Sequence, residues 1–367
     1  MELEKLRQLH PEHWEKANAI RVLTLDAVAA ANSGHSGMPI GMADVTTVLF
    51  EKHLKFSTDH PNWPDRDRFI LSAGHGSMLL YSIAYLCGYT DFDIDQLKNF
   101  RQLGKKTAGH PENFLSDVIE TTTGPLGQGI ANSVGFAIAE ESLRERFGRN
   151  IIDHHTFVIA GDGCLMEGVS QEAISLAGHL RLHKLIVFWD NNNITIDGTI
   201  DLTDSTDQKT RFEASGWEVI EIDGHDPEEI HSAILAAKKS EKPTMIACKT
   251  HIAIGTAAQD TSKGHGALTD PELIKDAREV YRWSHKPFDI PKSIKEQWEQ
   301  AGREGQKAFK RWQSNLENLS NSKRKEFERI FSGDAPKKLT STIRKFKKES
   351  SAALPTIATR KSSELTL

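Results

Sequence analysis

The stretch from Thr156 to Ile194 constrains the fold most, because two apolar runs flank a helical pattern within it. The first run ends at the turn Gly161-Asp162-Gly163, and the second run, 185–189, ends at the polar loop 190–193. Between them, apolar residues recur at helical spacing. The stretch therefore predicts a strand, a helix and a parallel strand, which is the repeating unit of an α/β sheet.

Asp162 and Asn192 each follow the end of a predicted strand, thirty residues apart. Ligands of open α/β sheets bind beyond the carboxyl ends of the strands, so both side chains are expected at one edge. A carboxylate, an amide carbonyl and a main-chain carbonyl suit a hard divalent cation, and so little protein charge indicates a metal that also binds ligand phosphates. Alternatively, the two segments are an ordinary turn and an ordinary loop, and the spacing alone does not separate these interpretations.

Other segments of the chain continue the alternation of strands and helices. Short apolar runs predict further strands over 68–72, 118–123, 217–222 and 244–248. Helical patterns cover 11–32, 78–87, 168–181 and 230–239, and a helix rich in small residues follows Gly129. We therefore predict a doubly wound, mostly parallel sheet with helices on both faces. From Pro291 onward, helical patterns and a basic tract replace the strands, which predicts a helical linker.

The composition narrows the classes of partner and compartment. A formal net charge of −5 over 367 residues argues against nucleic acid as the main partner. The three cysteines, Cys87, Cys164 and Cys248, have no zinc spacing and form no disulfide framework, as is typical of a reducing compartment. No apolar run reaches the roughly 18 residues of a membrane span, and the first 16 residues do not resemble a signal peptide. We expect a cytoplasmic protein with no membrane partner.

The loop from Gly124 to Gly129 lies between a predicted strand and a predicted helix. Its glycine order is G-x-x-G-x-G, whereas the dinucleotide fingerprint is G-x-G-x-x-G, and no acidic residue follows at a strand end about 20 positions on. This argues against a nicotinamide dehydrogenase. A glycine-rich turn that opens a helix still favours phosphate binding. Close helix packing by small residues such as Gly135 explains the composition equally well.

Six of the 16 histidines directly follow a glycine, where chance would give about one. They are His35, His75, His110, His179, His225 and His265. His179 lies inside a predicted helix and His225 precedes a helix cap, so we interpret both as structural. The other four lie on turns near element ends, where imidazoles suit proton transfer to a polar substrate.

Seven motifs resemble, in chain order, those of the transketolases, a family that depends on thiamine diphosphate. They are SGHSG at 33–37, LSAGHGS at 71–77, GHPE at 109–112, TTGPLGQG at 122–129, GDGCLMEG at 161–168, DNNNITIDG at 190–198 and ATRKSSE at 358–364. The thirty-residue separation of Asp162 and Asn192 also matches the cofactor signature of the family. The resemblance runs through the whole chain.

The resemblance implies a role for each matching residue. Asp162, Asn192 and the main-chain carbonyl of Ile194 would hold Mg²⁺, or Ca²⁺ or Mn²⁺, against the diphosphate. The residues expected to contact thiamine diphosphate are His75, Gly124, Pro125, Leu126, Gly163, Glu167, Asn192 and His265. Glu167, with Glu172, would also lie at the interface with a second chain of a homodimer. The residues expected to bind substrate are His35, His110, His265 and Arg360. The three histidines would be catalytic, and Arg360 would bind the sugar phosphate.

The implied activity is transfer of a two-carbon ketol unit from a ketose phosphate to an aldose phosphate, in the pentose phosphate pathway. The implied domains are a diphosphate-binding domain over 1–320, a helical and basic linker over 321–352, and the start of a pyrimidine-binding domain over 353–367. The glutamate that activates the pyrimidine ring would lie beyond Leu367. We therefore expect a truncated transketolase, inactive alone; the alternatives are the N-terminal subunit of a split enzyme and a non-catalytic cofactor-binding module.

Two positions depart from the family pattern. Ser36 stands where the family usually has proline, and Ser262 stands where it usually has a second histidine in the loop that precedes His265. The second departure leaves the loop geometry around His265 open.

Overall fold

The computed structural model describes residues 1–366, which divide into two compact units, one of residues 1–313 and one that begins at Ser314. The predicted boundaries at 320 and 352 remain predictions, and Leu367, the end of the predicted third segment, lies outside the described residues. No helix among residues 1–366 is long and apolar enough to cross a membrane.

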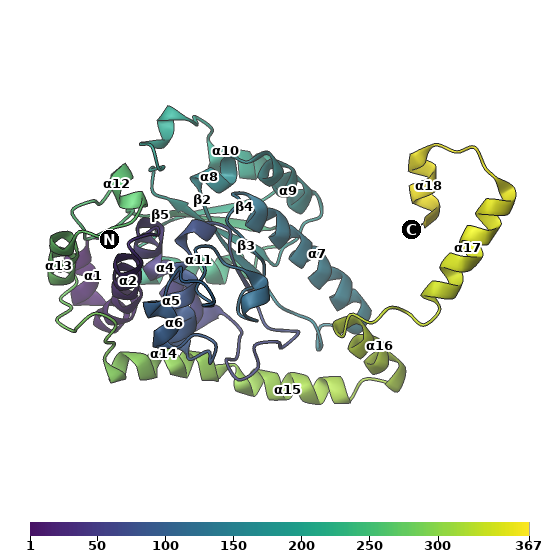
Figure 1. The fold of residues 1–367 in the computed structure, drawn as a ribbon, viewed down its shortest axis with the longest axis horizontal. Helices are drawn as coiled ribbons and strands as arrows, with labels where there is room; N and C mark the ends of the chain where they lie inside the picture. Colours follow the sequence, from purple (N-terminus) through teal and green to yellow (C-terminus); the bar gives the residue numbers. More distant parts are fainter. Residues whose placement is uncertain (367) are drawn as a thin grey trace. The chain divides into compact units, whose positions relative to one another are not determined.

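The core of the first unit is a sheet of five parallel strands (Figure 1). The strands are β1 (Arg68–Leu71), β2 (Thr156–Gly161), β3 (Leu185–Asn191), β4 (Glu218–Asp223) and β5 (Thr244–Lys249), in the order β1-β2-β3-β5-β4. β2, β3 and β5 have neighbours on both sides and are almost entirely buried, as parallel strands between helical layers must be. The predicted parallel α/β architecture is confirmed.

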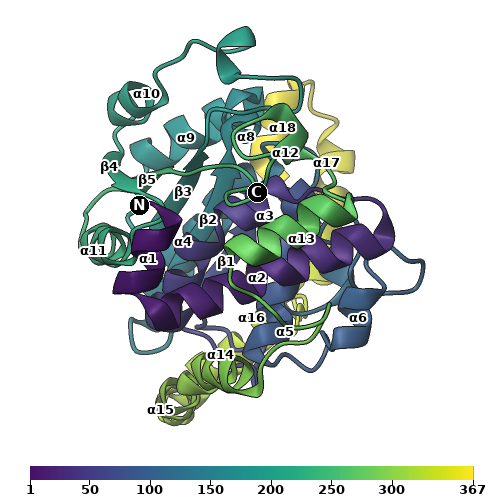
Figure 2. The same cartoon turned by 90° about the vertical axis from the view of Figure 1, so that its left-hand side faces the viewer.

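Helices cover both faces of this sheet (Figures 1 and 2). The chain moves in one direction from β1 through β3 and returns from β4 to β5, so right-handed crossovers place the connecting helices on opposite faces. α7 (Gln128–Phe147) and α9 (Gly168–His179) pack together on one face. α11 (Pro227–Ala237) packs with α4 (Ala43–Val48) on the other.

α2 (Pro11–Ala31) forms a further layer against α4 and α5 (Met78–Cys87). Every residue from Lys16 to Val28 is buried, so both the apolar and the polar side chains of this stretch belong to the core. The other helices of the first unit are short or peripheral. They are α1 (Leu3–Leu9), α3 (Gly37–Gly41), α6 (Ile94–Lys98), α8 (Asp162–Met166), α10 (Gln208–Ala214), α12 (Ser262–His265), α13 (Pro271–Val280) and α14 (Lys292–Glu304).

α15 (Gln306–Glu317) runs across the boundary between the units. The second unit continues with α16 (Asn321–Phe331), α17 (Leu339–Ala353) and α18 (Thr359–Thr366), and it has no strand among its residues up to 366. The predicted change from strands to helices after Pro291 is therefore observed.

The predicted strand over 118–123 does not form. Its β-branched side chains make hydrogen bonds in place of a backbone ladder: the Thr123 hydroxyl donates to the Leu71 carbonyl at 2.8 Å, and Thr121 accepts from Asn132 at 2.8 Å. Glu120 pairs with Arg66 and Arg68. The segment therefore lies beside the end of β1 as an irregular chain, and it leads into the loop at Gly124.

Two helical glycines offer a matched test of the packing. A Cβ at Gly178 in α9 would lie 1.7 Å from the Ser215 carbonyl oxygen, whereas a Cβ at exposed Gly135 in α7 would meet no atom within 4 Å. Gly135 therefore does not serve close packing. We expect Gly178→Ala to lower the free energy of unfolding by about 2 kcal/mol or more, and Gly135→Ala to raise it by about 0.5–1 kcal/mol. Chemical denaturation of both variants checks this, and equal effects would contradict the packing of α9 on Ser215.

Candidate active site

The site is built on the carboxyl ends of the adjacent strands β2 and β3. Gly161 pairs in register with Asp190, so Asp162 and Asn192 emerge side by side where the two strands end. The predicted edge is therefore formed. Asp162 begins α8 and is buried, and its Oδ1 accepts a hydrogen bond from the Trp189 indole N–H at 2.8 Å.

A second carboxylate, Asp190, lies beneath this edge and is fully buried. Its oxygens accept hydrogen bonds from the Asn192 amide at 2.9 Å and from the Thr250 hydroxyl. The Asn192 carbonyl oxygen accepts the Ile194 N–H at 2.9 Å, which fixes the turn that follows β3. Asp190 thus holds Asn192 in one orientation, with its nitrogen toward the strand end.

The two carboxyls share an environment that penalises negative charge. Burial raises the pKa of Asp162 to about 7, and the nearby charge of Asp190 adds to the effect. Burial also raises the pKa of Asp190 to about 6. A cation beside them would stabilise both charged forms, so this edge suits a positively charged ligand atom.

The edge opens into a cavity of about 320 Å³ that gathers most of the predicted site residues. Ten of them line it: His35, His75, His110, Gly124, Leu126, Asp162, Gly163, Asn192, Ile194 and His265. They come from seven separate segments of the chain between α2 and α13. Residues more than 200 positions apart in sequence therefore share one cavity.

Three of the histidines form a mutually packed group. The ring centroids of His35 and His75 are 5.1 Å apart, those of His35 and His265 5.5 Å, and those of His75 and His265 5.0 Å. The pKa of His35 is lowered to about 4 and that of His75 to about 3, mainly by burial and secondly by the neighbouring His265. The rings are therefore neutral near pH 7, and each can both donate and accept a hydrogen bond.

His35 has a ring nitrogen with no partner in the described part of the chain. Its Nδ1 is buried and makes no hydrogen bond within residues 1–366, although the side chain lines the cavity. An unpaired buried polar atom is costly unless a ligand satisfies it. This nitrogen therefore favours a polar, hydrogen-bonding ligand in the cavity.

Ser36, one of the two departures from the family pattern, joins the segments that carry His35 and His265. Its N–H donates to the Gly266 carbonyl at 2.9 Å, and its hydroxyl accepts the Leu268 N–H at 3.3 Å. A proline at this position could make neither bond. Ser262, the other departure, begins α12, which ends at His265.

Two glycines allow the loops to approach the cavity closely. Gly124 has φ +145°, and a Cβ there would lie 3.1 Å from the His110 ring. A Cβ at Gly163 would lie 2.9 Å from the Leu126 side chain. Glycine is therefore required at position 124 by conformation and favoured at 163 by space.

Three predicted site residues do not line this cavity. Pro125 is exposed between two residues that do, and Glu167 is exposed at the residue before α9, where Glu172 is exposed too. Arg360 is an exposed residue of α18 in the second unit. The roles of these residues remain predictions.

Several cavity residues were missed by the sequence reasoning. They include Met38, Cys164, Asp190, Thr195, Ile196 and Ile252. Asp190 could have been found, because a carboxylate two residues before Asn192 at a strand end also falls on the binding edge. The apolar residues carry no such pattern, since an apolar cavity wall looks like core in a sequence.

The donor set fits a divalent cation that binds partly to a ligand. Within residues 1–366, no three His, Cys, Asp or Glu side chains cluster as a protein-only metal centre would require. The edge offers the buried carboxyls of Asp162 and Asp190, the amide oxygen of Asn192 and main-chain oxygens, and a hard cation would complete its shell with phosphate or water oxygens. The roles of Asp162, Asn192 and Ile194 as metal ligands remain predictions.

Comparison with known proteins identifies the family. Residues 13–336 match the family described as transketolase, thiamine diphosphate binding domain. The chain belongs to the transketolase family. It is 55% identical to the transketolase of Rhodobacter capsulatus over 368 aligned residues, which is 100% of this chain and 55% of that protein. It is 49% identical to transketolase 2 of Escherichia coli, over 96% of this chain and 54% of that protein.

Solved transketolase structures share the fold. The structure from Campylobacter jejuni matches with a TM-score of 0.84 and 44% identity, over 87% of this chain and 50% of that chain. The structure from Leishmania mexicana matches with a TM-score of 0.86 and 41% identity, over 89% and 50%. The chain thus carries a transketolase thiamine diphosphate-binding domain and spans about half the length of these relatives.

The buried histidines predict a pH dependence of stability. The pKa of His75 is lower in the folded than in the unfolded chain, so the unfolded state binds more protons as the pH falls below about 6.5. The contribution of His75 to stability should be constant above that pH and fall toward pH 3, with a slope of up to about 1.4 kcal/mol per pH unit, whereas the raised pKa values of Asp162 and Asp190 contribute a slope of the opposite sign. Urea denaturation of the cofactor-free protein at pH 5.0–7.5 should therefore show a less positive slope of stability against pH in His75→Gln than in the unmodified chain. The matched control is His179→Gln, at an exposed site in α9; an unchanged slope in His75→Gln would contradict this account.

Proposed function

We propose that this chain supplies the diphosphate and metal side of a transketolase active site. The observation that carries the proposal is the buried edge of Asp162, Asp190 and Asn192, which opens into the same cavity as His35, His75 and His265. One end of the cavity thus suits a cation with phosphate, and the other offers neutral imidazoles. Membership of the transketolase family supports thiamine diphosphate as the ligand that joins the two ends.

Asp162, the Asn192 side chain and the Ile194 carbonyl would hold Mg²⁺, or Ca²⁺ or Mn²⁺. Asp190 orients Asn192 through the 2.9 Å hydrogen bond and adds negative charge below the site. Outer-shell carboxylates of this kind fix the orientation of a ligand group and strengthen metal binding. Gly124, Pro125, Leu126, Gly163 and Glu167 would contact the cofactor from the surrounding loops.

Thiamine diphosphate, when bound, supplies the nucleophilic carbon that takes up and releases a two-carbon unit. The histidines of this chain would manage the protons. His35 and His265 would exchange protons with the hydroxyl groups of a ketose donor, and His110 would bind its first hydroxyl. Their lowered pKa values keep them neutral near pH 7, so each can accept a proton.

Solved structures of relatives support sugar phosphates as the substrate class. Transketolase from Pichia stipitis, about 40% identical to this chain, has been solved in complexes with xylulose-5-phosphate, fructose-6-phosphate and sedoheptulose-7-phosphate. We propose ketol transfer between sugar phosphates of this class, in the pentose phosphate pathway and the cytoplasm. Arg360 would bind the phosphate of the sugar through its two-pronged guanidinium.

A second chain would complete the site. Glu167 and Glu172 are exposed on and beside α9, which suits an interface with a partner copy. The part of the relatives that this chain does not span would supply the pyrimidine side. A non-catalytic module that binds metal and diphosphate is the second candidate, because the edge of Asp162 and Asn192 lies wholly within this chain.

The test is ketol transfer from xylulose-5-phosphate by residues 1–367 alone and fused to the remaining half of the Rhodobacter capsulatus relative. We expect activity from the fusion only, and a loss of at least about tenfold in its Asp162→Asn variant, because the metal loses its charged ligand. Asp276→Asn, at an exposed site in α13, is the matched control and should be unaffected. Comparable activity from residues 1–367 alone would contradict the proposal, and cofactor binding with an inactive fusion would favour the binding module.

A further inference from the structure

Arg101 lies next to two segments that carry cavity histidines, and the proposed function gives it no role. It follows α6 by three residues and does not line the cavity of the three packed histidines. Its φ is +62°, in the left-handed region that few residues other than glycine adopt, and its N–H donates to the Thr107 carbonyl at 2.8 Å. Such a backbone persists only where surrounding contacts stabilise it.

The guanidinium of Arg101 contacts both histidine-bearing segments. Its Nη1 donates to the Ser33 hydroxyl at 2.8 Å, in the stretch 33–35 that ends at His35 and is called the His35 segment below. A Cβ at Gly109 would lie 3.2 Å from Nε and 3.5 Å from Nη2, so the guanidinium also lies against the stretch 107–110, the His110 segment. One side chain therefore joins the two segments.

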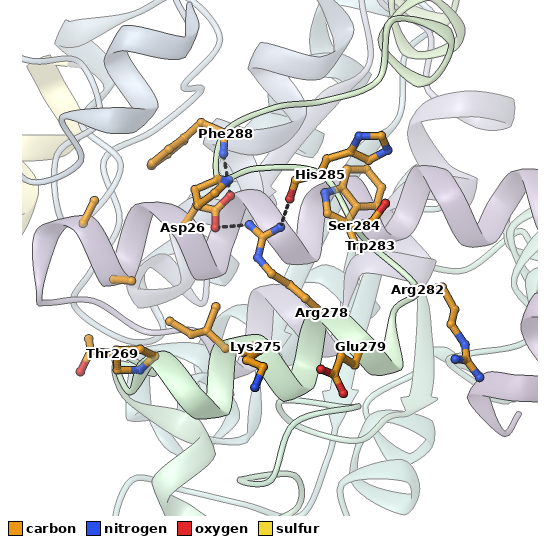
Figure 3. A pocket seen from close by; sticks show the side chains of 15 residues that line it. Asp26, Thr269, Lys275, Arg278, Glu279, Arg282, Trp283, Ser284, His285 and Phe288 are labelled. Atoms are coloured by element: carbon orange, nitrogen blue, oxygen red, sulfur yellow. Dashed lines mark hydrogen bonds and ion pairs between the residues drawn. The ribbon is translucent and has the colours of Figure 1, made fainter.

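The His35 segment is fixed through α2 as well. Arg278 of α13 pairs with Asp26 in the last two turns of α2, and the chain continues from this helix into the segment (Figure 3). The loop of Arg101 packs on the segment directly, since a Cβ at Gly34 would lie 3.0 Å from the Phe100 ring. The position of the His35 ring thus depends on both α2 and this loop.

The positive charge of Arg101 is not compensated. Arg101 forms no ion pair within residues 1–366, and its Nε is buried without a hydrogen-bond partner in that range. Burial lowers the pKa of Arg101, because a partly buried cation loses hydration. A neutral side chain would avoid this cost, so packing alone does not explain an arginine at this position.

The charge of Arg101 acts on both imidazoles. Burial is the main reason that the pKa of His35 and that of His110 are lowered, and the charge of Arg101 contributes to both. His265 and His110 also lower the pKa of His35, and Glu112 raises that of His110. A cation beside an imidazole disfavours its charged form, so Arg101 helps to keep both rings able to accept a proton near pH 7.

We propose that Arg101 is a positioning residue of the active site, which joins the His35 segment to the His110 segment and holds a positive charge beside both rings. The proposal rests on the proposed function in one point, namely that these two histidines meet the hydroxyl groups of a sugar donor. The planar guanidinium suits the role, because it contacts Ser33 and Gly109 at once. Lysine would keep the charge but has no planar fork to span the two segments.

The charge is tested in residues 1–367 alone, without cofactor or activity. NMR titration of the chain, labelled with carbon-13 at histidine Cε1, measures the pKa of His110, and His110→Gln assigns its resonance. We expect Arg101→Met to raise this pKa and Arg101→Lys to leave it unchanged, because only the first removes the charge. Lys105→Met, which removes a charge from the same loop, is the matched control and should raise it less. No rise in Arg101→Met, or an equal rise in Lys105→Met, overturns the charge role.

The joining role is tested in the fusion with the remaining half of the Rhodobacter capsulatus relative. We expect kcat/KM for xylulose-5-phosphate to fall at least about tenfold in Arg101→Lys, because the histidines lose their relative position. Ser33→Ala, which removes only the 2.8 Å hydrogen bond, should cost about threefold or more. In Arg101→Met the acidic limb of the pH profile should also move to higher pH, which a merely structural defect would not cause.

The outcomes separate this proposal from the proposed function. Lys105→Met should change neither kcat/KM nor the pH profile, and unchanged kcat/KM in both Arg101→Lys and Ser33→Ala overturns the joining role. An inactive unmodified fusion would contradict the proposed function, whereas the titration of His110 would still support or overturn the role of the Arg101 charge. Circular dichroism checks that each variant is folded, and Arg101→Gln replaces Arg101→Met if the latter does not fold.

Discussion

The structure depends on negative charge that is buried at the carboxyl edge of the central sheet. Asp162 and Asp190 lie at the ends of neighbouring parallel strands, and burial raises the pKa of both. Neutral hydrogen-bond donors, namely Trp189, Thr250 and Asn192, are the groups that stabilise them within this chain. Such donors only partly replace water around a carboxylate, so the edge is suited to a cation.

The rest of the fold brings neutral, hydrogen-bonding groups to face that edge. α2 is buried along most of its length and delivers His35 just beyond its end, and Ser36 joins this segment to the one that carries His265. The loop at Gly124 has a positive φ that favours glycine, and it places Leu126 next to Gly163. Charge at one end of the cavity and imidazoles at the other suit a cofactor with an anionic tail and a reactive head.

Much of this arrangement could be predicted from the sequence, for physical reasons. Parallel strands buried on both faces are continuous apolar runs, so β2 and β3 and the residues that follow them were evident. The histidines were evident because they follow glycines on turns. The prediction of a strand over 118–123 was wrong. β-branched residues are frequent in strands, but the threonines of this segment make side-chain hydrogen bonds instead of a backbone ladder. The bonds of Ser36 to Gly266 and Leu268 depend on contacts between distant segments, which local patterns do not contain.

We propose that Asp162 and Asn192 bind a cofactor's diphosphate through a divalent metal rather than directly. The most direct measurement is calorimetric titration of the chain with thiamine diphosphate and with thiamine, each in Mg²⁺ and in a chelator. The account predicts that Mg²⁺ strengthens the binding of thiamine diphosphate by at least about a hundredfold and does not change the binding of thiamine. Equal affinity for thiamine diphosphate with and without Mg²⁺ would contradict it.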